Sequence, residues 1–131
     1  MSEPVYLLDS EGLSQAVLGN RAMGARLKDA DRSGIRVMTS SMTLIEAYHK
    51  RVKKAAWTWT LSKIAVEPVT RDIAGEAIEL LEAAGLHGHK YAIDAALAAV
   101  ALRQPGSVTI FTSDEEDMKL LCGDRVVVQG I

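Results

Sequence analysis

The sequence contains very little cysteine, because Cys122 is the only one among 131 residues. No disulfide can form within the chain, and a reducing compartment is therefore expected. An apolar segment long enough to cross a bilayer is also missing, and the first four residues form neither a basic nor an apolar stretch. These absences predict a cytoplasmic protein that does not enter membranes.

The chain also lacks an excess of charge of either sign. Its formal net charge is -2 at pH 7, with a pI near 5.9, which argues against general binding to polyanions. A contact with nucleic acid must then come from a local basic patch, and the candidates are Lys50, Arg51, Lys53 and Lys54. An ordinary solvated helix face would carry the same charges.

Two nucleotide-binding signatures are absent as well. The sequence has no G-x-x-x-x-G-K-[ST] and no G-x-G-x-x-G, which disfavours nucleotide hydrolysis and dinucleotide binding. With 48% apolar residues among 131, the chain is expected to form one domain, residues 1–131, around one core.

Short apolar runs alternate with helical patterns along the chain. Strands are predicted at residues 5–8, 35–39, 64–69, 108–112 and 125–129, and the third contains Pro68, which suits a sheet edge. Helices are predicted near residues 10–19, 21–30, 40–47, 54–63, 70–85, 91–102 and 114–121. This order favours an α/β fold, with a mostly parallel sheet and helices on both faces.

Two helices carry more specific predictions. In residues 70–85 the apolar side chains expected on one face are Ile73, Ala74, Ala77, Ile78 and Leu81. In residues 54–63, Trp57 and Trp59 point to roughly opposite sides of a helix, so one is expected in the core and one at a partner surface.

Four acidic residues stand within or directly after apolar segments: Asp9, Glu46, Asp94 and Asp114. Asp9 and Asp114 follow strands, and they would meet if those strands are neighbours where the strand order reverses. Gathered carboxylates would form oxygen ligands for a hard divalent cation such as Mg²⁺, and their repulsion would require a metal or protons. The pattern thus points to metal-dependent phosphodiester chemistry.

Each acid also has an ordinary structural interpretation except one. Asp9 could cap the following helix, and Glu46 could pair with Lys50 one turn away. Asp114 and Asp117 could serve a helix start with a capping box at Ser113-x-x-Glu116. Asp94 lies in an otherwise apolar helix, where an unpaired carboxylate is costly, so it is the strongest functional candidate.

Four short motifs that contain these acids resemble those of the PIN-domain ribonucleases, especially the VapC-type toxins of bacterial toxin-antitoxin pairs. The matching segments are Leu7-Leu8-Asp9-Ser10, Thr43-Leu44-Ile45-Glu46, His89-Lys90-Tyr91-Ala92-Ile93-Asp94-Ala95 and Thr112-Ser113-Asp114-Glu115-Glu116-Asp117-Met118. Together they span nearly the whole chain. A hydrophobic aromatic residue is common after the fourth motif, and Met118 stands there instead.

The resemblance implies a PIN-like three-layer fold and an endoribonuclease that uses one or two Mg²⁺ or Mn²⁺ ions. Its catalytic set would be Asp9, Glu46, Asp94 and Asp114, with Asp117 as an auxiliary acid in the metal set beside Asp9, Asp94 and Asp114. Thr112 or Ser113 would orient this cluster. The ions would neutralise charge on the phosphate, and one acid would accept a proton from the attacking water.

The resemblance further implies an antitoxin that places a basic side chain against the carboxylates. Protein partners, namely a second copy in a homodimer and this antitoxin, are expected to dock on the helices around residues 42–59. The large apolar residues that suggest such an interface are Met38, Met42, Tyr48, Trp57 and Trp59.

Two other functions compete with this interpretation. One is a catalytically silent PIN-like module that binds RNA or a protein. The other is a phosphoacceptor receiver domain, which would need paired acids after the first strand, where Leu8-Asp9-Ser10 offers one.

Overall fold

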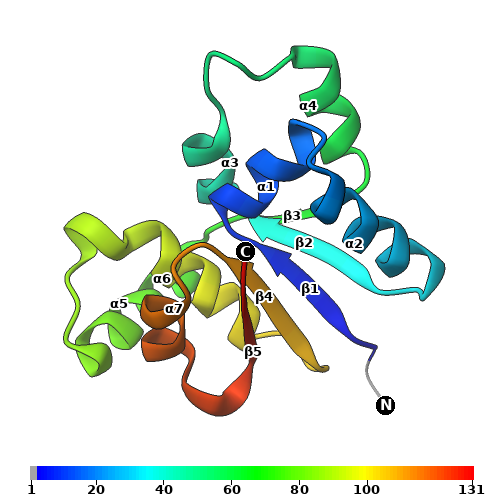
Figure 1. Cartoon of the computed structure of the whole chain (residues 1–131). Helices are drawn as coiled ribbons and strands as arrows, with labels where there is room; N and C mark the ends of the chain where they lie inside the picture. The colour runs from blue at the N-terminus through cyan, green and yellow to red at the C-terminus, as the bar shows by residue number, and fades with distance from the viewer. Residues whose placement is uncertain (1–2) are drawn as a thin grey trace.

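The computed structural model describes residues 3–131, and a five-stranded parallel sheet forms its centre (Figure 1). The strands are β1 (Val5–Leu8), β2 (Arg36–Ser40), β3 (Ala65–Glu67), β4 (Val108–Thr112) and β5 (Val127–Gly130). They lie in the order β3-β2-β1-β4-β5, and each neighbouring pair is parallel. The connections change direction between β1 and β4, so the carboxyl ends of these two strands mark the switch point where α/β folds place their ligands.

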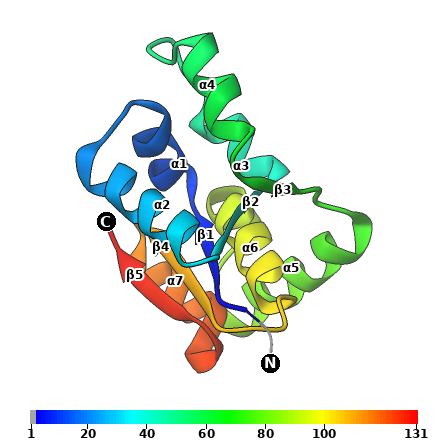
Figure 2. The ribbon, with the colours of Figure 1, turned by 90° about the vertical axis from the view of Figure 1, so that its right-hand side faces the viewer.

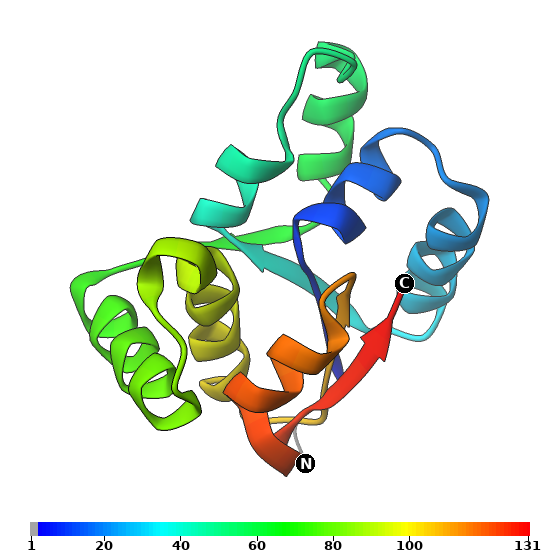
Figure 3. The same cartoon turned by 60° about the vertical axis from the view of Figure 1, so that its left-hand side comes forward.

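Seven α-helices of the described residues flank this sheet. They are α1 (Ser10–Val17), α2 (Arg21–Arg32), α3 (Ser41–Ala47), α4 (Lys54–Leu61), α5 (Arg71–Ala84), α6 (Gly88–Leu102) and α7 (Glu115–Cys122). In Figure 2 the sheet lies between α1 and α2 on one side and α5 and α6 on the other, while Figure 3 brings α5, α6 and α7 to the front. The layers are therefore helix, sheet and helix, as the α/β prediction requires.

The strands divide their apolar side chains between these two layers because successive residues of a strand face opposite ways. Leu7 and Ile110 join the cluster formed with α5, α6 and α7. Leu8 and Phe111, the next residue on each strand, join the cluster formed with α2. A third cluster, containing Leu13, unites α1 with α3 and α4. Both faces of the central strands are thus buried, as parallel sheets require.

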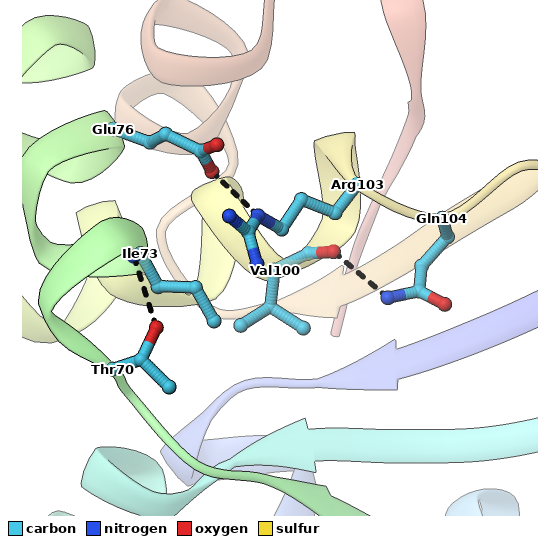
Figure 4. A network of polar contacts seen from close by, with 6 residues as sticks. All are labelled: Thr70, Ile73, Glu76, Val100, Arg103 and Gln104. Carbon is cyan, nitrogen blue, oxygen red and sulfur yellow. Dashed lines mark hydrogen bonds and ion pairs between the residues drawn. The ribbon is translucent and has the colours of Figure 1, made fainter.

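Helix α6 is the most deeply buried helix, and all seven residues from 95 to 101 are buried. Figure 4 shows the polar contacts at its end and on the neighbouring α5. The Thr70 hydroxyl caps α5 by accepting from the Ile73 amide at 3.2 Å, and Arg103 donates to Glu76 on α5 at 2.9 Å. Of these contacts, only the Arg103–Glu76 pair joins the two helices, and their buried side chains pack in one core cluster, which holds α6 and therefore Asp94 in place.

Two details differ from the sequence prediction. Ala74 and Ile78 are exposed, because α5 packs through the narrower line of Ile73, Ala77 and Leu81. The last strand starts two residues later than predicted, since a 3-10 helix, η1 (Gly123–Arg125), comes before it. The other strand and helix predictions agree with the structure to within about three residues at each end. Among residues 3–131, no helix combines the length and apolar character that crossing a membrane requires.

Candidate acidic site

Asp9 lies directly after β1 and joins the carboxyl ends of β1 and β4. One carboxylate oxygen, Oδ1, accepts from the Gly12 amide at 2.8 Å and so caps α1. The other, Oδ2, accepts from the Ser113 amide at 2.9 Å, in the loop that follows β4. Asp9 is 3% exposed. The capping role considered from the sequence is therefore real, and it coexists with a place at the switch point.

Glu46 lies in the last turn of α3 and does not pair with Lys50. Its carboxylate accepts a hydrogen bond from the Ser10 hydroxyl, in the first turn of α1. The two ion pairs in residues 3–131 are Arg103 with Glu76 and Lys119 with Glu115, so the alternative pairing of Glu46 is wrong. The Ser10 contact was not foreseen, although Ser10 directly follows Asp9 in the first motif.

Asp114 is the N-terminal cap position of α7, yet its side chain makes no capping bond. The capping box expected from Ser113 is therefore absent, since the helix begins one residue later. The loop is shaped instead by Thr112, whose buried hydroxyl accepts from the Asp114 amide at 3.0 Å. Asp114 is exposed, and its carboxylate remains available for a ligand. Asp117, one turn further along, is partly buried.

Asp94 is the acid of the cluster whose pKa the other carboxylates change. Burial, and then the negative charges of Asp114, Asp9, Glu46 and Asp117, raise the pKa of Asp94 from 3.8 to about 7. The other four acids predicted for the site therefore lie close enough to Asp94 for their negative charges to raise its pKa. Such mutual repulsion is what a cation or a proton would relieve.

These carboxylates are not arranged as a ready-made coordination sphere. Within residues 3–131, no group of three or more histidine, cysteine, aspartate or glutamate side chains has its ligand atoms placed to hold a metal ion. Both oxygens of Asp9 accept a backbone hydrogen bond, and Glu46 accepts one from Ser10, but a carboxylate oxygen with one such bond keeps a lone pair for a cation. Oxygen donors and uncompensated negative charge still suit a hard divalent cation, so the residues fit Mg²⁺ or Mn²⁺ by chemistry.

A hollow of about 550 Å³ opens beside the N-terminal end of α7. Its lining contains both predicted acids of the fourth motif and the paired Lys119 and Glu115, namely Ser113, Asp114, Glu115, Glu116, Asp117 and Lys119. Asp9 and Asp94 do not line it. The carboxylate cluster therefore adjoins an open surface that a large, extended substrate can reach.

The basic candidates lie in the loop between α3 and α4 and at the start of α4. Lys50, Arg51, Lys53 and Lys54 are all exposed. None of the four takes part in an ion pair within the described chain. This loop begins immediately after α3, the helix that carries Glu46, so the four cations follow one acid of the cluster by four to eight residues along the chain.

The comparisons with known proteins agree with this arrangement. A comparison with curated protein sequences gives no significant match. Among solved structures, the crystal structure of VapBC2 from Rickettsia felis, bound to a DNA fragment from their promoter, is similar in fold, with a TM-score of 0.70. That likeness covers 97% of this chain and 98% of the other at 16% sequence identity. The family model for the PIN domain matches residues 6–122, which include all of β1 except Val5, the switch point and all four acidic motifs. The chain therefore belongs to the PIN domain family.

Proposed function

We propose that this protein is a Mg²⁺- or Mn²⁺-dependent endoribonuclease and the VapC-like toxin of a toxin-antitoxin pair. The observation that carries the proposal is the placement of Asp9 and Asp114 together at the carboxyl ends of β1 and β4, and the raised pKa of Asp94, caused by burial and by four neighbouring carboxylates, supports it. An acidic cluster of this kind is unfavourable without a counter-charge. PIN domains are generally nucleases, and the VapBC2 complex that resembles this chain supports the toxin assignment.

The ligands of the cation would be Asp9, Asp94 and Asp114, with Asp117 as the auxiliary acid. When bound, a divalent cation neutralises charge that develops on the phosphate and makes a water molecule a better nucleophile. Asp9 keeps the loops after β1 and β4 together through its two backbone hydrogen bonds. Glu46, oriented by Ser10, is the acid best placed to accept a proton from the attacking water, since Asp94 and Asp114 would be engaged as ligands.

The test is cleavage of single-stranded RNA by the purified chain, with Mg²⁺ or Mn²⁺ and with EDTA. Asp94→Asn preserves side-chain volume and removes one charge, so it should abolish cleavage without unfolding the protein. Asp124→Asn is the matched control, because Asp124 is exposed in η1. Full activity of Asp94→Asn, or activity that persists in EDTA, would refute the proposal.

A catalytically silent PIN module is the second candidate, and one observation favours it: no three-ligand group is preformed among the described residues. In that case the wild-type chain would bind RNA or a protein but would not cleave RNA with any cation. The EDTA experiment therefore separates the two functions directly.

A protein partner is the second part of the proposal. Several large apolar side chains of α3, α4 and the loop between them are exposed: Ile45 is 78% exposed, Tyr48 50% and Trp59 65%. Trp57 instead packs against the third core cluster, as expected for one of the two tryptophans, and Met38, which was predicted to contribute to the interface, is 1% exposed and belongs to the core. Burial of the exposed side chains would favour association.

A groove of about 680 Å³ continues this surface between α2 and α4. Apolar side chains such as Leu27, Val37 and Ile64 line it, and Trp59, Lys28 and Lys63 stand along it. We expect an antitoxin segment with apolar and acidic residues to bind there, and a basic antitoxin side chain to approach the carboxylates. A second copy of this chain is the alternative occupant of the α3 and α4 surface.

Co-expression with the neighbouring reading frame and sedimentation of the isolated chain test this part. Trp59→Ala should weaken the complex, whereas Leu120→Ala should not, because Leu120 is equally apolar and 58% exposed on α7. A chain that stays monomeric and retains no co-expressed protein would contradict the proposal of a partner.

A further inference from the structure

Two serines of α1 face the end of α3 and the loop beyond it. Ser10 and Ser14 are four residues apart and therefore lie on the same side of the helix. Ser10 donates to Glu46, and the Ser14 hydroxyl lies 3.3 Å from Nε2 of His49. The loop before α4 is thus fastened to α1 one turn away from the contact that orients Glu46.

The hydrogen bonds of His49 define which ring nitrogen carries the proton. The amide of Arg51 donates to Nδ1 of His49 at 3.2 Å. An amide can only donate, so Nδ1 must be the acceptor, and the neutral ring carries its proton on Nε2. Nε2 then donates to Ser14. The imidazole therefore links the backbone of Arg51 to α1 through two hydrogen bonds of fixed direction.

The same loop contains one buried apolar residue, and the cations around it are exposed. Val52 is 9% exposed and packs in the third core cluster, and its amide donates to the His49 carbonyl at 3.0 Å. Lys50, Arg51 and Lys53 are exposed on either side of it. Holding His49 and Val52 inward leaves these cations directed to solvent, where they can meet a polyanion.

The cations lie within a short reach of the acidic cluster. Arg51 follows Glu46 by five residues, which span at most roughly 18 Å even when fully extended. A nucleic-acid strand whose cleaved bond lies at the carboxylates can therefore bring its neighbouring phosphates to this loop. Phosphate contacts of this kind fix the register of a strand without reading its sequence.

We propose that His49 is a positioning residue for the substrate, which holds the basic loop of residues 48–53 in place against Ser14 so that its cations contact the phosphates of single-stranded RNA beside the cleaved bond. The inference rests on the proposed nuclease function. His49 itself need not touch the RNA, because it acts through the backbone of Arg51 and through α1.

The test compares variants that remove one hydrogen bond at a time. Ser14→Ala removes the hydrogen-bond partner of Nε2 without substituting any residue of the loop. His49→Asn keeps an acceptor near the position of Nδ1 but loses the hydrogen bond to Ser14. His49→Ala removes both. Arg36→Ala is the control, because Arg36 is an exposed cation at the amino end of β2, away from the carboxyl ends that carry the site.

Binding of a fluorescent single-stranded RNA is measured against salt concentration, without a divalent cation, so that binding is separated from cleavage. We expect His49→Ala to weaken binding and to make the salt dependence shallower by roughly 0.7 in log-log slope for each phosphate that the loop no longer neutralises. His49→Asn should recover part of the affinity, and Ser14→Ala should resemble His49→Asn. In cleavage assays, KM should rise several-fold more than kcat falls.

Two further results decide between this role and a merely structural one. If Lys50→Ala and Arg51→Ala together already flatten the salt dependence, adding His49→Ala should change it little, because both act through the same phosphates. If His49→Ala and Ser14→Ala lower the melting temperature but leave the salt slope and KM unchanged, the role of His49 is refuted, while the proposed nuclease function is not affected. Failure of the wild-type chain to bind RNA would overturn this role together with the proposed function.

Discussion

Replacing Asp94 by asparagine should make the metal-free protein more stable at neutral and alkaline pH. Asparagine has nearly the size of aspartate and no charge, so it imitates the protonated acid. In the wild type, burial and the charges of Asp114, Asp9, Glu46 and Asp117 raise the pKa of Asp94 to about 7 from 3.8. The folded protein therefore bears an electrostatic cost whenever Asp94 is ionised.

The size of this cost follows from linkage. A rise from 3.8 to about 7 would correspond to roughly 4 kcal/mol at about 1.4 kcal/mol for each pKa unit. Asp94 is only partly buried, so solvent screening reduces the effect to about 1–2 kcal/mol. For a domain of this size, that corresponds to a rise in melting temperature of about 3–8 °C in the variant.

The pH dependence has a defined sign. A carboxyl whose pKa is raised on folding holds its proton more tightly in the folded state, so it destabilises the fold progressively between pH 4 and pH 7 and by a constant amount above. The variant and the wild type should then differ most above pH 7 and converge near pH 4. Thermal melts in EDTA at pH 4.5 and pH 8 measure this, with Asp124→Asn as the control for loss of a surface charge. A variant that is less stable than the wild type at pH 8 would instead indicate a structural ion pair and refute the reasoning.

Three other predictions concern cation binding, the reactivity of Cys122 and the packing of the core. Mg²⁺ at ten times its dissociation constant should stabilise the wild type by roughly 1.4 kcal/mol and leave Asp94→Asn unchanged, with Ca²⁺ and ionic strength controlled; indifference of the wild type would argue against a site. Burial raises the pKa of the Cys122 thiol to about 11, so a thiol reagent at pH 8 should label Cys122 only after unfolding, and rapid labelling of the native chain would contradict its burial. Leu97→Ala should cost about 2–5 kcal/mol in urea unfolding, because Leu97 is 1% exposed in the core of α6, and a cost near zero would show that this core is loosely packed.

The sequence predicted most of the fold because its local patterns and its tertiary structure agree. β1 and β4 have the predicted bounds, since each is a short apolar run that ends at a polar turn. Helix α6 was recognised by its apolar residues on every side, and these are buried as the pattern indicates. Thr70 and Gly85, which bound α5, were predicted from their capping chemistry, and Gly85 adopts the left-handed conformation with φ of 68°.

The remaining features depend on which elements become neighbours, and local patterns do not contain that information. Ile78 fits the predicted apolar face of α5, but α6 covers a narrower line and leaves it exposed. Met38 looks like a surface anchor, but it lies on β2, an inner strand between β1 and β3. The contact of Ser10 with Glu46 joins residues 36 positions apart, and it exists because α1 packs on α3. No periodicity in the sequence reports such a contact.

Asp9 shows why the structural and the functional interpretations of an acidic residue need not exclude each other. Its two oxygens accept from Gly12 and from Ser113, so the residue that caps α1 also holds the loop that carries Asp114. Substitution of Asp9 would remove a helix cap, leave two amides without acceptors and displace another acid at once. Loss of activity in such a variant could not be assigned to any single cause. Asp94 makes no such backbone contacts among the described hydrogen bonds, and for this reason the decisive measurements on the acidic cluster belong at Asp94.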